Sequence, residues 1–321
     1  MKHSVSSSPI ISVVIPTYNR ADLLMDALQS VCQQTLGFLY YEVIVIDNNS
    51  EDNTYGVTKE FCHCYPNVRY YLETRQGISY ARNRGWKESQ GKYIAYIDDD
   101  CKVPKQWLAV ANDVIERVSP SVFGGPIIAF YNAPKPYWFK DSYGSHDWGN
   151  EAKILTNDTL FGGNIFFSRT VLENVGGFDS SLGMHGKEIG FGEETALQLL
   201  IRAKMPDQTC YYDPMLYVYH LVRAEKMTFR GMIRRRFVSG AYNYGVFHGN
   251  ASLSVGRNQL LKKSIKILLL CVVDFTFGVL KRNRSQYPYI QNYFYEHTAK
   301  YISKLGAIYE QFRRLFCTSK V

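Results

Sequence analysis

Short apolar runs alternate with stretches of helical spacing through the first hundred residues of the chain. An apolar run of four to eight residues between turn residues is typical of a buried strand. Apolar residues that recur every three or four positions, such as Leu24, Leu28 and Val31, are typical of one helix face. The pattern predicts strands at 10–16, 41–46, 68–72 and 93–97, and helices at 21–34, 53–64 and 78–89. This alternation indicates α/β architecture, with βαβ units and a mostly parallel, Rossmann-like sheet flanked by helices.

The pattern becomes less regular after residue 100. It predicts short strands near 122–126, 162–167 and 216–219, and helices at 171–175 and 193–204. Residues 131–150 are rich in Tyr, Trp, Asn, Asp and Pro and are expected to be ordered but irregular. Residues 180–192 hold four glycines and are expected to form a mobile loop.

Polar residues directly follow three of the predicted parallel strands. Thr17 and Asn19 follow the first strand, Asp47 follows the second, and Asp98-Asp99-Asp100 follows the fourth. Right-handed crossovers place the carboxyl ends of such strands on one edge of the sheet, where open α/β sheets bind ligands. The chain has neither a G-x-G-x-x-G after the first strand nor a G-x-x-x-x-G-K-[ST]. A dinucleotide-binding fold and a P-loop are therefore disfavoured, and phosphates would be held by a metal ion and by cations.

The triplet Asp98-Asp99-Asp100 is a candidate metal site. Three adjacent carboxylates repel one another unless a cation neutralises them. Carboxylate oxygens suit a hard divalent ion such as Mg²⁺ or Mn²⁺, which commonly also binds a substrate phosphate. The triplet by itself leaves a second interpretation open, because Asp is also frequent in solvated turns and at helix N-caps.

Composition and charge narrow the class of protein. The chain has 321 residues, enough for one large domain with an extension or for two domains, and a net charge of +8. The seven cysteines include no C-x-x-C pair, so neither a zinc site nor a disulfide framework is indicated, and a reducing, cytoplasmic compartment is expected. The apolar run near the N-terminus is interrupted by Pro16 and is too short for a signal peptide. No uncharged apolar stretch reaches the ~18 residues of a transmembrane helix.

The positive charge is concentrated after residue 225. From 226 to 321 Lys and Arg greatly outnumber Asp and Glu, whereas the first 225 residues are net acidic. Cations alternate with apolar residues at 226–237, and the run 267–280 holds a single charged residue, Asp274. As a helix this run would be about 21 Å long, shorter than the roughly 30 Å hydrocarbon core of a bilayer. The pattern favours an extension on an anionic membrane surface over one that binds nucleic acid, so no nucleic acid partner is expected.

Seven short segments, in order along the chain, resemble those of the family 2 glycosyltransferases of the GT-A fold. They are 12–20 (SVVIPTYNR), 45–50 (VIDNNS), 77–85 (GISYARNRG), 97–100 (IDDD), 162–164 (GGN), 176–179 (GGFD) and 192–194 (GEE). Each is short, but seven in the expected order form a specific signal. The resemblance, which covers about residues 10–222, implies a GT-A domain at 10–225, with a nucleotide-binding half at 10–100 and an acceptor half at 101–225. A helical, basic extension is expected at 226–321.

The resemblance implies an enzyme that transfers a sugar from a nucleotide sugar, often a UDP-sugar, to an acceptor hydroxyl with inversion, using Mn²⁺ or Mg²⁺. Asp98 and Asp100 match the Asp-x-Asp motif, with Asp98 toward the ribose and Asp100 on the metal. His220 occupies the place of a further metal ligand in some relatives, although a His at a strand end also serves structural roles. The residues that the resemblance assigns to the donor are Pro16, Thr17, Asn19, Asp47, Arg82, Asp98 and Asp99.

Glu193-Glu194 matches the acidic pair of the family, one member of which is the catalytic base, and we favour Glu194. The alternative role for both is to stabilise the dipole of the helix that they begin. The acceptor site is less defined, and its candidate residues are Gly163, Asn164, Trp138 and Trp148.

The expected function is transfer to a saccharide or lipid-linked glycan in the synthesis of a cell-surface polysaccharide or glycoconjugate, at the inner face of the cell membrane. One alternative is a nucleotidyltransferase, which would need a Gly-rich, cationic loop after the first strand that residues 17–20 do not supply. The other is a non-catalytic nucleotide-sugar-binding protein, which the presence of acids at each expected position disfavours.

Overall fold

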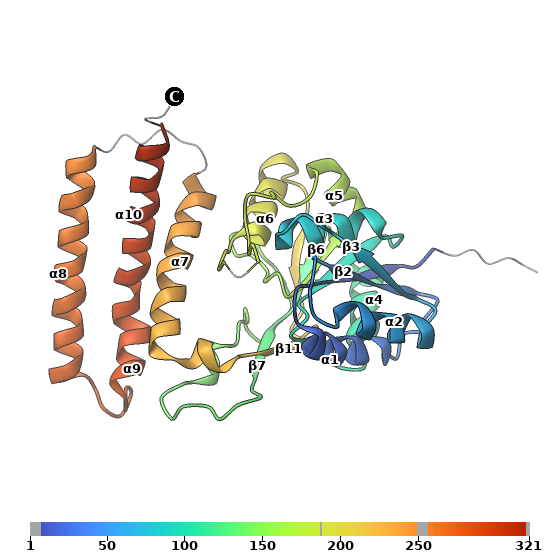
Figure 1. The fold of residues 1–321 in the computed structure, drawn as a ribbon, viewed down its shortest axis with the longest axis horizontal. Coiled ribbons are helices and arrows are strands. Elements are labelled where there is room, and N and C mark those ends of the chain that lie inside the picture. The colour runs from blue at the N-terminus through green and yellow to red at the C-terminus, as the bar shows by residue number, and fades with distance from the viewer. Residues whose placement is uncertain (1–7, 187, 249–255, 319–321) are drawn as a thin grey trace, which may run out of the picture. The chain divides into compact units, whose positions relative to one another are not determined.

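The chain folds into an α/β unit and a helical unit. The structure is a computed structural model that describes residues 8–186, 188–248 and 256–318. Within this range the α/β unit comprises 8–130, 144–186 and 193–221. The helical unit comprises 131–143, 188–192 and the described residues from 222 onward. Each unit is therefore assembled from three separate stretches of the chain (Figure 1).

A mixed sheet of eight strands forms the centre of the α/β unit, in the order β3-β2-β1-β4-β9-β6-β10-β8. The strands are β1 (Ile11–Thr17), β2 (Tyr41–Asp47), β3 (Val68–Leu72), β4 (Tyr93–Ile97), β6 (Val122–Gly124), β8 (Lys153–Ile154), β9 (Asn164–Ser168) and β10 (Cys210–Tyr212). The first four are mutually parallel, as the sequence predicts, whereas β9 runs antiparallel to both β4 and β6. The antiparallel pairing brings Asn164 opposite Ile97, so the start of β9 lies beside the aspartate triplet.

Helices cover both faces of this sheet because its central strands are apolar on both sides. Val13 and Ile15 of β1 contact one hydrophobic core, and Val14 between them belongs to the other. The first core includes residues of α1 (Ala21–Cys32), α2 (Thr54–Cys64) and α4 (Trp107–Val118). The second includes residues of α3 (Ile78–Glu88), α5 (Arg169–Val175) and α6 (Glu193–Lys204). Burial on two faces is typical of parallel strands, and the expected α/β fold class is confirmed.

A second, three-stranded sheet completes the α/β unit. It has the order β5-β11-β7, with β5 at Cys101–Lys102, β7 at Ile127–Phe130 and β11 at Val218–Leu221. β11 begins two residues later than the sequence pattern predicts. Its antiparallel pairing with β5 places His220 opposite Cys101, directly after the aspartate triplet.

The helical unit contains three long helices. These are α7 (Phe229–His248), α8 (Arg257–Lys281) and α10 (Ala299–Thr318), with α10 between the other two (Figure 1). Short helical segments lie at Asp141–Tyr143, Ala224–Met227, Ile290–Tyr293 (α9) and Phe294–Thr298. α7 and α10 approach closely at Gly240 and Gly306, where an added Cβ would lie 1.9 Å from the carbonyl oxygens of Ser303 and Phe237. None of the helices in the described part of the chain combines the length and apolar character that crossing a membrane requires.

Candidate active site

The sheet brings the predicted polar residues to one edge. Thr17 ends β1 directly beside Asp47 at the end of β2, and Asp98 follows the last residue of β4. The chain then turns, with the Cys101 amide donating to the carbonyl of Asp98 at 3.1 Å. The Leu221 amide donates to the carbonyl of Asp100 at 3.0 Å, which ties the triplet to β11.

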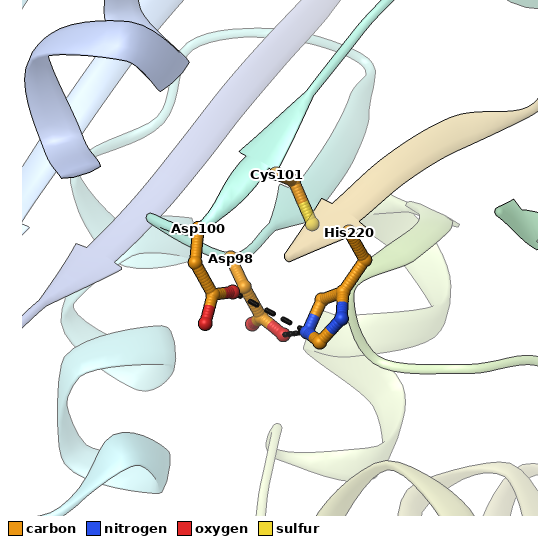
Figure 2. A group of neighbouring side chains, drawn as sticks. All are labelled: Asp98, Asp100, Cys101 and His220. Atoms are coloured by element: carbon orange, nitrogen blue, oxygen red, sulfur yellow. Dashed lines mark ion pairs between the residues drawn. The ribbon is translucent and has the colours of Figure 1, made fainter. Parts of the chain in front are cut away.

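Four side chains with possible metal-ligand atoms meet at this turn. One ligand atom from each of Asp98, Asp100, Cys101 and His220 lies within 4.8 Å of the others (Figure 2). His220 Nε2 is 3.3 Å from Asp100 Oδ1 and 3.9 Å from Asp98 Oδ2. Burial and the neighbouring carboxylates raise the pKa of the Cys101 thiol well above its usual value. Two carboxylates and an imidazole therefore form a donor set that fits a divalent metal ion, and the protonated thiol is a poor ligand.

A pocket lies beside the triplet, and Asp99 forms part of its wall. Its lining residues are Pro16, Thr17, Tyr18, Arg20, Asn48, Gln76, Ile78, Ala81, Asp99, Met184 and Gly186. Asp99 accepts hydrogen bonds from Thr17 Oγ1 at 2.9 Å and Arg20 Nη1 at 2.8 Å. Burial raises the pKa of Asp99 to about 6, against the opposing effect of the Arg20 charge. Asp99 thus holds the pocket wall together, whereas Asp100 faces His220.

Asn19 and Asp47, which the resemblance assigns to the donor, do not line this pocket. Asn19 has a left-handed backbone (φ 52°), donates its amide to Ser50 Oγ at 2.9 Å and accepts from the Glu51 amide at 2.7 Å. Buried Asp47 accepts from the Ser50 amide at 2.8 Å and from the Tyr70 hydroxyl at 2.9 Å. In the structure both residues stabilise the loops after β1 and β2, and their contact with a donor stays a prediction.

The acidic pair Glu193-Glu194 begins α6, and its two carboxyl groups differ in their hydrogen bonds. Glu193 accepts a hydrogen bond from Arg82 Nη1 at 2.5 Å. Glu194 has a buried carboxyl oxygen, Oε2, for which the described part of the chain provides no hydrogen-bond partner. Burial, followed by the charge of Glu193, raises the pKa of Glu194 to about 8. Glu193 is thus bound to a cation, whereas burial favours the protonated form of Glu194.

Two glycines allow the backbone to pass close to these carboxylates. A Cβ on Gly162 would lie 2.9 Å from Arg82 Nη2 and 3.3 Å from the Glu194 carboxyl carbon. A Cβ on Gly163 would lie 3.0 Å from Asp98 Oδ2. The segment that leads into β9 therefore lies against both the acidic pair and the metal-binding turn.

Comparison with known proteins decides the family. A family model described as "Glycosyl transferase family 2" matches residues 12–176, just over half of the chain. The chain belongs to glycosyltransferase family 2. Its class as a transferase enzyme, predicted from the seven segments, is thereby confirmed.

Proteins of Haloferax volcanii and Campylobacter jejuni are similar to this glycosyltransferase. Glycosyltransferase AglE of Haloferax volcanii is 32% identical over 179 residues, or 55% of this chain and 58% of AglE, so the match spans less than two thirds of that relative. A second protein of that organism, described as a glucosyl-dolichyl phosphate glucuronosyltransferase, is 27% identical over 82% of this chain and 85% of its own. A Campylobacter jejuni protein is described as a GalNAc(5)-diNAcBac-PP-undecaprenol beta-1,3-glucosyltransferase. It is 25% identical to this chain over 68% of this chain and 67% of its own length.

Solved glycosyltransferase structures share the fold. One is the mannosyltransferase PcManGT from Pyrobaculum calidifontis, solved in complex with GDP-Man and Mn²⁺. The match covers 98% of this chain and 76% of the PcManGT chain, with a TM-score of 0.56 and 17% sequence identity. Another is S. aureus TarS, residues 1–349, solved in complex with UDP. The match covers 95% of this chain and 91% of the TarS chain, with a TM-score of 0.55 and 18% sequence identity. The predicted GT-A fold is confirmed.

The four acceptor candidates of the glycosyltransferase fall in different surroundings. Gly163 lies against Asp98. Asn164 is fully buried, its amide group bonds to Trp107 Nε1 and to the carbonyls of Pro126 and Leu216, and its contact with an acceptor stays a prediction. Trp148 donates to the Thr159 carbonyl at 3.1 Å. Trp138 packs within the helical unit, where its carbonyl accepts from Asn292, and its contact with an acceptor stays a prediction.

Eight of the eleven pocket residues of the glycosyltransferase, Arg20, Asn48 and Gln76 among them, were not among the predicted site residues. Arg20 is the cation of the loop after β1, and Asn48 directly follows Asp47, so both stand in segments that carried the resemblance. Asn48 Oδ1 accepts from the Gly77 amide at 2.8 Å, which closes the pocket against α3. Gln76 bonds to Asn48 at 3.2 Å, and no local pattern singles it out.

Proposed function

We propose that this glycosyltransferase uses a divalent metal to transfer a sugar, with inversion, from a nucleotide-diphosphate sugar to a saccharide or lipid-linked glycan acceptor. The observation that carries the proposal is that a pocket, a cluster of possible metal ligands and the acidic pair adjoin one another at one edge of the sheet. The pocket lined by Thr17 and Asp99 adjoins the Asp98–Asp100–His220 cluster, and Arg82 connects that cluster to the acidic pair. A UDP-sugar is our proposed donor, and the solved relatives bind UDP or GDP-Man.

The proposed chemistry assigns each residue one task. Asp98, Asp100 and His220 would hold the metal, which when bound stabilises the charge of the departing nucleotide diphosphate as a Lewis acid. Glu194 removes the proton from the acceptor hydroxyl while that oxygen bonds to the anomeric carbon. The bond from that carbon to the diphosphate breaks on the opposite face, so the configuration inverts. The proton remains on Glu194, and the electron pair leaves with the nucleotide diphosphate.

A thermal-shift screen of nucleotide sugars with and without Mn²⁺ tests the proposal. A ligand at 100 times its dissociation constant stabilises the folded state by about 2.7 kcal/mol, which is readily measured. We expect one nucleotide sugar to raise the melting temperature in Mn²⁺ and much less in EDTA. A response to a nucleoside triphosphate with a sugar phosphate would instead support the nucleotidyltransferase. A shift without turnover on any glycan or polyprenyl-linked acceptor would support the binding protein, and no shift with any nucleotide diphosphate would contradict the proposal.

We also propose that the helical unit binds an anionic membrane, peripherally and at the cytoplasmic face, where a lipid-linked acceptor would be presented. Large apolar side chains of α8 are exposed, namely Leu261, Ile265, Leu268, Leu269, Leu270, Val272, Val273, Phe277, Val279 and Leu280. Asp274 points inward and accepts from Thr298 Oγ1 at 2.6 Å. Lys266 and Lys281 flank the run 267–280 at its two ends, so a helix lying in the surface keeps both in the headgroup layer.

Binding of the full-length protein to vesicles tests this membrane proposal. Replacing Leu269 and Val273, which are 61% and 65% exposed, by Glu is expected to lower the affinity for phosphatidylserine-containing vesicles at least about ten-fold. The matched control is Leu39→Glu, at a residue of the α/β unit that is 67% exposed. Sedimentation with vesicles measures both. Equal binding by the double variant and the wild type would overturn the proposal.

A further inference from the structure

Arg82 joins two carboxylates that the chain supplies from distant positions. It lies on α3, and its Nη1 donates to Glu193 Oε1 at 2.5 Å. Its Nη2 donates to Asp98 Oδ1 at 3.3 Å and to the Gly162 carbonyl at 3.4 Å. The Arg82 side chain is 3% exposed, so these bonds form away from bulk water. One guanidinium thus contacts both the acidic pair and the proposed metal ligand.

The guanidinium of Arg82 is also fixed by two aromatic rings. Its Cζ lies 6.0 Å from the centre of the Tyr96 ring and 5.5 Å from that of Phe178. The Tyr96 hydroxyl donates to the Arg82 carbonyl at 3.2 Å, which holds the same turn of α3. Since side chain and backbone are both constrained, the fork of donors has a defined direction. A planar fork that is held in this way fixes the separation of the two carboxylates it binds.

We propose that Arg82 is a positioning residue, which sets the acidic pair against the metal-binding turn, rather than a ligand of the donor diphosphate. This proposal rests on the proposed function. Arg82 engages Glu193 and thereby leaves Glu194, one residue further along α6, as the carboxylate that faces the acceptor. Through Asp98 it also orients one side of the metal site. The competing arrangement is a direct bond from Arg82 to the donor, since Arg82 Nε is buried with no hydrogen-bond partner in the described part of the chain.

The substitution Arg82→Lys separates these arrangements, because an ammonium keeps the charge but not the fork. Substitution of a residue that orients a metal ligand typically lowers metal affinity or activity 10- to 100-fold. We therefore expect kcat to fall about 100-fold, and the Mn²⁺ concentration that half-saturates the thermal shift with a nucleoside diphosphate to rise about ten-fold. Glu193→Gln should lower kcat similarly and leave the Mn²⁺ requirement unchanged. In the double variant kcat should fall little further, since both changes break one coupled unit.

Arg69→Lys is the matched control. Arg69 also pairs with a buried glutamate, Glu42, in the same unit, and its Nη1 donates to Tyr71 at 2.9 Å. It should leave kcat and the Mn²⁺ requirement unchanged. Additive losses in the double variant, or a loss of UDP and GDP binding by Arg82→Lys in EDTA, would overturn the positioning role in favour of direct donor contact.

Two further results keep the test decisive. If Arg82→Lys does not fold, the cycle of Glu193→Gln and Asp98→Asn replaces it. Because both carboxylates share Arg82, their effects on kcat should be coupled, and additive effects would overturn the proposal. Failure of the proposed function itself would look different, since the wild type would then show neither an Mn²⁺-dependent shift nor turnover.

Discussion

Glu194→Gln is expected to abolish glycosyl transfer while the protein still binds its donor. A Gln side chain preserves the shape of Glu194 but cannot accept the proton of the acceptor hydroxyl. General-base catalysis contributes about 10²–10⁴ in rate, so kcat should fall by at least that range. Turnover of a nucleotide sugar measures the loss, and the thermal shift with Mn²⁺ and the same donor serves as the binding control. Unchanged turnover would remove Glu194 from the mechanism.

The pH dependence of the same variant checks the environment of Glu194. Burial and Glu193 raise the pKa of Glu194 from 4.5 to about 8, so the protonated carboxyl is the form that the fold favours. The stability that this group contributes is therefore full below about pH 4.5 and is lost as the pH rises through about 8. In the same window the ionised base accumulates, so kcat/KM should rise with pH. Glu194→Gln should flatten both the melting-temperature and the activity profile; a wild-type rate that is constant from pH 6 to 9 would contradict this.

Asp100→Ala is expected to remove metal-dependent donor binding. The Asp100 side chain is 3% exposed and lies 3.3 Å from His220, so its loss would leave the proposed metal with Asp98 and the imidazole. We expect the Mn²⁺-dependent part of the thermal shift to disappear, a loss of about 2.7 kcal/mol at 100 times the dissociation constant. Calorimetric titration of Mn²⁺ with UDP present measures the same loss directly.

Asp99→Ala is the neighbouring control for Asp100→Ala. Asp99 bonds to Thr17 and Arg20 in the pocket wall, so its removal should weaken nucleotide binding yet preserve the response to Mn²⁺. The Asp99→Ala variant should therefore lose less of the Mn²⁺-dependent thermal shift than the Asp100→Ala variant. The reverse order would show that Asp99, and not Asp100, is the principal metal carboxylate.

The first half of the fold could be predicted because its strands are local, apolar and ended by turn residues. β1 to β4 each coincide with a predicted run, and their polar ends identified the edge that carries the pocket. β8 and β10 have two and three residues, too few for periodicity to register. Their pairing depends on partners far along the chain, which a local pattern does not encode.

The same limit applies to the site residues. The resemblance located Arg82 and Glu193, but their bond spans 111 positions and only the folded chain brings them together. Asn164 matched a glycosyltransferase segment, yet Trp107 and Leu216 take up its amide group. A motif thus reports that a residue type stands at a position, whereas its contacts decide between a structural and a chemical role.

The helical unit is formed by three separate segments of the chain, and this limits where the enzyme can be truncated or joined to a relative in a chimaera. Residues 131–143 belong to that unit, where Lys140 pairs with Glu296 at 2.6 Å, and residues 188–192 contribute Phe191, whose ring lies 6.4 Å from that of Tyr242. A truncation at residue 225 would leave both segments without these partners. A chimaera meant to exchange acceptor preference or location between relatives would need to exchange all three segments together. The C-terminal region alone is therefore only part of the helical unit.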